Sequence, residues 1–283
     1  MFSGQTPSRM KFSPRIIAAV VMGILLSSLA FVSWYPREPS LRGKALGTWI
    51  EQYYHTRTIR GSPQDASATE AREAVLEIGT NAIPTLLARV RTRDSGIQKR
   101  LLLWLYQRNL IQASQPKSEL ARNRADWGFA ILGQVGEPAV PELVAALKDE
   151  DPGVRATAAR CLGHIGERAE SAIPALLPLL EERNQGIPIL SAMDALRSIR
   201  GRPDLVIPAM VEYLSGDRMS WNYSVPAMSV LRAYGADAAP AIPAIKAYLR
   251  HPDSDKRNGA DSALTFIEEQ VKLKASSSAS AQQ

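Results

Sequence analysis

The residue types that most often catalyse reactions or bind metals are few in this chain, and their spacing does not bring them together. The three histidines, His55, His164 and His251, lie far apart, and no two have the short spacing of metal ligands. Cys161 is the only cysteine, which excludes an internal disulfide, and its position on an apolar helical stripe predicts packing in the core. We therefore predict no catalytic residue, no metal site and no cofactor.

Basic residues concentrate in one stretch of the chain. Residues 85–125 contain nine basic residues and only two acidic ones, Asp94 and Glu119, which gives a local excess of +7 (9 − 2). Such an excess predicts a docking site for an acidic partner or for anionic lipid headgroups, and solvated helix faces are the plainer alternative. This basic patch consists of Arg89, Arg91, Arg93, Lys99, Arg100, Arg108, Lys117, Arg122 and Arg124.

The elements that must position these residues follow a repeat. Five times a glycine closes an apolar stretch and a proline opens the next, at Pro84, Pro141, Pro174, Pro208 and Pro243. The last four prolines are separated by 33, 34 and 35 residues, a period typical of stacked solenoids. Apolar residues recur at helical spacing and strand-like alternation is scarce, so an all-α fold is predicted.

The clearest copy of the repeat predicts two antiparallel helices. Asp151 can cap the first helix, and Pro152 is tolerated in its first turn. Gly166 suits the left-handed conformation that ends a helix, and Pro174 opens the second helix. The core stripe of the first helix is Val154, Ala158, Cys161, Leu162 and Ile165.

This pattern resembles a known family. The run Asp-Pro-x-Val-Arg-x-x-Ala-Ala-x-x-Leu-Gly-x-Ile-Gly followed by Ala-Ile-Pro-x-Leu is similar to the HEAT repeat, in the short form of phycobilisome-lyase-type proteins. The match is clearest over residues 137–200 and extends over 66–95 and 201–268. The resemblance implies an α-solenoid that binds other macromolecules and is not an enzyme.

Two other activities of similar repeat proteins stay open. One is a lyase-type enzyme acting on a bound chromophore, and the other is a nucleic-acid-binding protein. Deoxyhypusine hydroxylase shares the repeat family but needs paired His-Glu steps, and no histidine of this chain is followed by glutamate. Nucleic acid is not expected as a partner, because the basic charge gathers at one site and not along many repeats.

An apolar segment before the repeats predicts a transmembrane helix. Residues 16–35 carry no charge, are about long enough to cross ~30 Å of hydrocarbon, and end in an aromatic pair. Residues 1–15 hold basic residues and no acidic ones, so this tail is expected in the cytoplasm and the repeats outside it. The alternative is secretion after signal-peptide cleavage, for which Ser28-Leu29-Ala30 offers small residues.

The first part of the array is expected to begin with a cap. Residues 36–65 should form a linker and a capping helix with one apolar face, made of Leu46, Trp49, Ile50 and Tyr53. Its sequence resembles the lead-in helix of membrane-anchored bacterial proteins of this kind. Pro84 to Pro141 spans 57 residues, so an irregular insertion is predicted near residues 107–124.

The repeats are expected to fill residues 66–270 and to end in a charged cap. Lys256 stands where Val154 stands in the clear copy, and Asp261 replaces Ala159, so the final helix turns charge outward. The remaining residues, 271–283, are rich in Ser, Ala and Gln and are expected to be disordered.

A partner is expected in the concave groove of the solenoid, at outward positions of one helix of each pair. These positions are mixed and nearly neutral, which suits a protein or peptide partner. They form three rows: Trp127, Thr157, Ser191, Pro226 and Gly259; Ala130, Arg160, Asp194, Ser229 and Ser262; and Gln134, His164, Ser198, Ala233 and Phe266. We predict partner contacts for Trp127, Arg160, His164, Asp194 and Trp221; packing of the tryptophans inside the solenoid is the alternative.

Overall fold

The computed structural model describes the repeats and the helix that precedes them. The described residues are 38–59, 66–94, 116–181, 186–215 and 223–280, with the single positions Arg100, Trp104, Gln107 and Arg108. The predicted anchor at residues 16–35 and the cytoplasmic tail lie outside them, as do Trp221 and Lys99. A search of the described helices finds none with the length and apolar character that a membrane span needs. The chain from Pro39 onward forms one compact unit.

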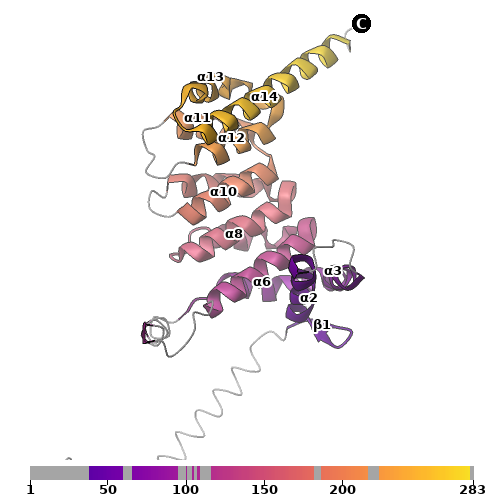
Figure 1. The fold of residues 1–283 in the computed structure, drawn as a ribbon. Coiled ribbons are helices and arrows are strands. Elements are labelled where there is room, and N and C mark those ends of the chain that lie inside the picture. The colour runs from indigo at the N-terminus through magenta and orange to yellow at the C-terminus, as the bar shows by residue number, and fades with distance from the viewer. Residues whose placement is uncertain are drawn as a thin grey trace, which may run out of the picture. The chain divides into compact units, whose positions relative to one another are not determined.

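The longer helix of each repeat belongs to a first row of helices that lie side by side (Figure 1). α8 packs between α6 and α10, and α12 packs between α10 and α14. The predicted all-α repeat architecture is thereby confirmed. These helices are α6 (Lys117–Leu132), α8 (Pro152–Ile165), α10 (Gly186–Ile199), α12 (Ser224–Ala233) and α14 (Ser254–Ser280). The first-row helix of the first repeat, α3 (Ala66–Ile78), packs mainly against the capping helix α2 (Leu46–Ile59).

Shorter helices form the second row, and a proline opens most of them. These helices are α4 (Ile83–Val90), α7 (Val140–Ala146), α9 (Ile173–Leu176), α11 (Pro203–Ser215) and α13 (Ile242–Lys246). Proline stands in the first turn of α4, α7, α9 and α13, where its missing N–H leaves no bond unmade. In α11 the helix begins at Pro203, so Pro208 lies inside it.

Short 3-10 segments connect or extend these helices. η1 (Gly79–Ala82), η2 (Gly133–Ala139), η3 (Gly166–Ala172) and η5 (Gly235–Ala241) join the first row to the second. η4 (Leu177–Glu181) follows α9, and η6 (Ala247–Arg250) follows α13.

Most first-row helices end at a glycine that takes a left-handed conformation, which glycine adopts without steric strain. Gly79, Gly133, Gly166 and Gly235 have φ between 53° and 71°. After α10 the corresponding residue is Arg200, with φ of 54°, and Gly201 comes one position later. A residue with a side chain is strained in this conformation, so the turn after α10 is less favourable than the others.

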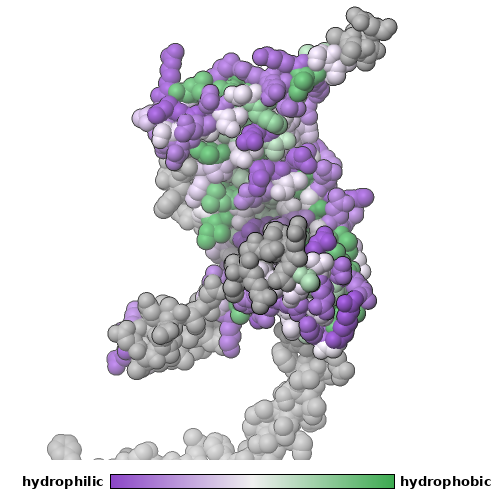
Figure 2. Space-filling view, turned by 45° about the vertical axis from the view of Figure 1, so that its right-hand side comes forward, coloured by the Kyte–Doolittle hydropathy of each residue, from purple (hydrophilic) through white to green (hydrophobic). Residues whose placement is uncertain are grey.

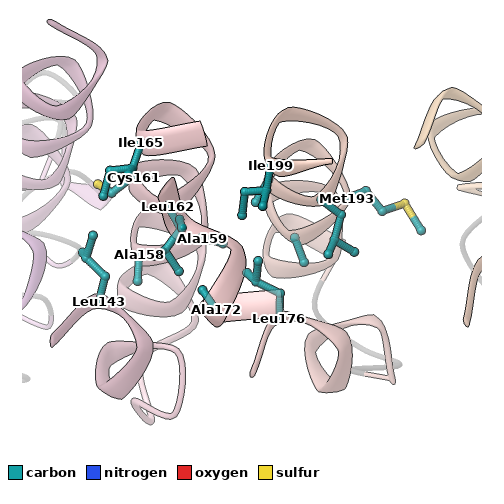
Figure 3. Packing of buried hydrophobic residues seen from close by; sticks show 14 of the residues in the cluster. Leu143, Ala158, Ala159, Cys161, Leu162, Ile165, Ala172, Leu176, Met193 and Ile199 are labelled. Carbon is teal, nitrogen blue, oxygen red and sulfur yellow. The ribbon is translucent and has the colours of Figure 1, made fainter. Parts of the chain in front are cut away.

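The core is one continuous cluster of apolar side chains between the two rows. The stripe predicted for α8 is fully buried throughout, and burial also raises the pKa of the Cys161 thiol. Figure 3 shows Leu162 of α8 close to the side chains of the second row, among them Leu143 and Leu176. Each repeat therefore buries its apolar residues against its neighbours.

Each end of the array is closed by a different device. α2 (Leu46–Ile59) buries Leu46, Trp49 and Ile50 against α3 and α6, so the predicted apolar face is a packed one. Before it, β1 (Ser40–Leu41) and β2 (Lys44–Ala45) form a small antiparallel hairpin, which the sequence did not predict. At the other end, Asp261 of α14 is exposed at the position where Ala159 is buried in α8.

Two predicted boundaries were wrong. Residues 271–280 are helical and not disordered, because α14 continues to Ser280 through a segment without glycine or proline. Extending an existing helix needs no new nucleation, so even Ser and Ala residues can follow it. The insertion expected near 107–124 ends earlier, because α6 already begins at Lys117.

The N-terminus of α6 is capped by a residue from before the insertion. The Asp94 carboxylate accepts a hydrogen bond from the Ser118 backbone N–H at 3.0 Å and another from the Ser118 hydroxyl at 2.6 Å. Such a bond satisfies a backbone donor that the helix itself leaves unpaired. Asp94 and the start of α6 therefore lie side by side, although they are 24 positions apart in the sequence.

Candidate protein-binding surface

The exposed side of the first-row helices is the most extended candidate surface. Two of the three predicted rows lie at this surface, exposed or half-buried: the row from Ala130 to Ser262 and the row from Gln134 to Phe266. In the remaining row, which begins at Trp127, Thr157 and Ser191 are buried. The Thr157 hydroxyl donates a hydrogen bond to the Gly153 carbonyl at 2.7 Å. On the side shown in Figure 2, hydrophobic residues occur in small groups among hydrophilic ones.

Two predicted contact residues are engaged with one carboxylate of the preceding repeat. Nε of Arg160 lies 3.1 Å from one Asp126 oxygen, and Nε2 of His164 lies 3.0 Å from the other. Burial opposes ionisation of Asp126, but the hydrogen bond to His164 and the charge of Arg160 outweigh it and lower the pKa of that carboxyl. This cluster joins α6 to α8 and leaves His164 exposed at the surface.

The other predicted contact residues have different surroundings. The Trp127 ring is half-buried and stacks on Tyr54 of α2, with centroids 3.6 Å apart and an angle of 13° between the planes. Trp127, a residue of α6, therefore packs against the capping helix α2, which is the alternative considered for it. Asp194 stays exposed and pairs with Arg197 of its own helix at 3.2 Å.

Arginines of the basic patch pair with acidic residues of other repeats or of the capping helix α2. The pairs are Arg91 with Glu142 at 3.6 Å, Arg93 with Asp149 at 2.6 Å, Arg122 with Asp151 at 3.5 Å, and Arg124 with Glu51. Arg108 lies over the ring of Trp104. Arg100 and Lys117 are exposed, and Arg89 is half-buried. The positive excess is consequently smaller in space than along the chain.

A hollow of about 480 Å³ opens between α10, α12 and α14. Its lining holds three arginines, two serines and one aromatic ring: Arg197, Ser198, Arg200, Ser229, Arg232, Ala233 and Phe266. The Arg232 guanidinium lies 5.3 Å from the centroid of the Phe266 ring, and its Nη1 donates a hydrogen bond to the Ser262 hydroxyl at 3.4 Å. Arg200 pairs with Glu167 at 3.5 Å.

Sequence analysis missed the arginines of this hollow. Ser198, Ser229, Ala233 and Phe266 belong to the predicted rows, but the arginines occupy neighbouring positions of the helices. Arg197 and Arg232 are separated by 35 residues, which is the period of the repeat at this point. Looking for one residue type at successive repeat positions would have found both.

The fold and this surface together define a helical-repeat protein with an extended polar face. Within the described residues, no group of three or more His, Cys, Asp or Glu side chains could hold a metal ion.

A comparison with protein families agrees with this class. The family model described as HEAT repeats matches residues 110–197. A crystal structure of an engineered protein is 20% identical, with coverage of 80% of this chain and 97% of that chain and a TM-score of 0.44. A designed armadillo repeat protein is 15% identical, with coverage of 78% and 99% and a TM-score of 0.44. No curated protein matches the sequence.

Proposed function

We propose that this protein is a non-catalytic scaffold that binds another protein through the exposed side of its first-row helices. The observation that supports this function is the continuity of two rows of exposed or half-buried side chains from α6 to α14. The buried stripe of the same helices holds the array together, so the outer rows are available for recognition. Their mixed polar character suits a protein partner better than a metal or a phosphate chain.

We also propose that residues 16–35 tether the protein to a membrane and that the repeats are exported. The uncharged sequence of this segment and the basic residues before it support the proposal. A periplasm-dependent reporter enzyme fused after residue 36 should be active, and a cytoplasm-dependent reporter at the same position should be silent. The opposite pattern would refute export. Release of the repeats into the medium would favour cleavage over anchoring.

Site-specific photo-crosslinking in the native membrane tests the binding surface. Ala130 of α6 and Ser198 of α10 are exposed on the proposed face, whereas Ala145 of α7 and Ser215 of α11 are matched exposed residues on the second row. A photoreactive amino acid at either first-row position should capture the same protein, and the second-row positions should not. Equal capture from both rows would refute the proposed face.

A further inference from the structure

We propose that the hollow between α10, α12 and α14 binds an acidic segment of the partner protein, in which a carboxylate side chain is next to an apolar one. This inference rests on the proposed function and specifies one site on the proposed face. Arg232 would receive the carboxylate, and the Phe266 ring would contact the apolar neighbour. The argument depends on charge, on the open aromatic ring and on the limited extent of the site.

The hollow carries positive charge that its own acidic residues do not fully compensate. Arg197 pairs with Asp194 and Arg200 pairs with Glu167, and both acidic side chains are 68% exposed. Exposed pairs of this kind contribute little free energy, so a better-placed carboxylate can replace them. In the part of the chain that the structure describes, Arg232 forms no ion pair, unlike Arg197 and Arg200.

Arg232 is held in a position that suits a carboxylate. Its Nη1 hydrogen bond to Ser262 and its place over the Phe266 ring restrict its rotamers before any partner arrives. A planar guanidinium can donate two parallel hydrogen bonds to a carboxylate. Because the side chain is partly ordered in advance, less conformational entropy is lost on binding.

Phe266 supplies an apolar contact beside this charge. The residue is 36% exposed, although it lies on a helix whose Leu264 and Ile267 are buried. Arginine and aromatic side chains provide much of the binding energy at protein interfaces. The hydroxyls of Ser198 and Ser229 in the same lining can bond to the backbone of a bound segment.

The extent of the site favours a peptide over nucleic acid. A phosphate backbone requires positive side chains over several repeats, because each added phosphate brings another negative charge. Along this face, however, Arg160 and His164 share Asp126, and Asp194 is acidic and exposed. A segment with one or two carboxylates needs no more charge than the hollow provides.

The test measures fluorescence anisotropy of a labelled decapeptide of alternating Glu and Leu as it binds the full-length protein in mild detergent. Replacing Glu by Gln in the peptide should weaken binding at least tenfold. Arg232→Gln should also weaken it at least tenfold, and Phe266→Ser at least fivefold. The control Arg168→Gln should leave binding unchanged, because Arg168 is likewise exposed but lies in η3, where it pairs with Glu137 at 3.7 Å.

Several outcomes would overturn the inference. Binding that is insensitive to Arg232→Gln, or equal for the Glu and Gln peptides, would refute the carboxylate site. Arg232-dependent binding of a ten-nucleotide single strand without peptide binding would assign the hollow to nucleic acid instead. Crosslinks from Ala130 without peptide binding would refute this site alone, whereas absence of crosslinks from both Ala130 and Ser198 would refute the scaffold function. Thermal unfolding followed by circular dichroism verifies that the variants fold.

Discussion

Replacing Arg200 by glycine is expected to stabilise the protein, although most substitutions destabilise. Arg200 has φ of 54°, and the left-handed conformation costs a residue with a side chain roughly 1–2 kcal/mol. Glycine removes this cost but loses about 0.5–1 kcal/mol through the greater freedom of the unfolded chain. The net gain in unfolding free energy is therefore about 0–1.5 kcal/mol. Loss of the exposed Arg200–Glu167 pair, which is worth roughly 0–1 kcal/mol, would reduce it.

Arg200→Ala separates the two contributions, because alanine loses the ion pair but keeps the backbone strain. Urea unfolding of the full chain in mild detergent, followed by circular dichroism, gives the unfolding free energies if the slope is unchanged. The glycine variant should be more stable than the alanine variant by about 1 kcal/mol. An ordinary helical position would show the reverse order, with glycine about 1 kcal/mol less stable. A glycine variant that is less stable than the alanine variant would refute the explanation of this turn.

Three further predictions test the core, the cap that Asp94 provides for α6, and the half-buried carboxylate of Asp126. Leu162→Ala should lower the unfolding free energy by about 2–5 kcal/mol in the same urea assay, because Leu162 is fully buried; a change near zero would contradict the assigned stripe. Asp94→Ala should cost about 1–2 kcal/mol through loss of the cap on Ser118, and Asp94→Asn should cost less because it keeps an acceptor. Asp126→Asn should be less stable than the natural protein at neutral pH. Because the folded-state pKa of Asp126 is lowered, this difference should persist above the ordinary aspartate pKa and disappear as the pH falls through the folded-state value; a difference independent of pH would contradict it.

The architecture could be predicted because each repeat carries its own local pattern. The stripe that contains Val154 and Leu162 is set by helical spacing, and its burial needs only a similar neighbour on each side. The turn after α10 could not be read in the same way. The offset of 34 residues between Arg160 and Asp194 places Arg200 at the position of Gly166, but its positive φ follows from where the helix ends, directly after Ile199. That end depends on packing against adjacent helices, which the residue pattern does not contain.

The distribution of charge was harder to predict because residues one period apart become neighbours in a stacked array. Arg160 and Asp126 are 34 positions apart, and the Tyr248 hydroxyl bonds to the Leu214 carbonyl across the same separation. Across the longer first interval, Arg93 meets Asp149 at a separation of 56, close to the 57 residues between the corresponding prolines. Charge in a repeat protein should therefore be summed over neighbouring repeats.

Applied to this chain, that rule changes which basic residues are candidates for binding. Arg93 and Arg122 belong to the stretch with the largest linear excess, yet both pair with acidic residues of the next repeat. The residue one period after Arg232 is Thr265, which is not acidic. Arg232 itself contacts Ser262 and Phe266 of α14, and neither of these residues is acidic. The charge of Arg232 therefore stays available to a partner, although the sequence around Arg232 is nearly neutral. For this reason Arg232, and not the basic patch, should dominate recognition of an acidic partner.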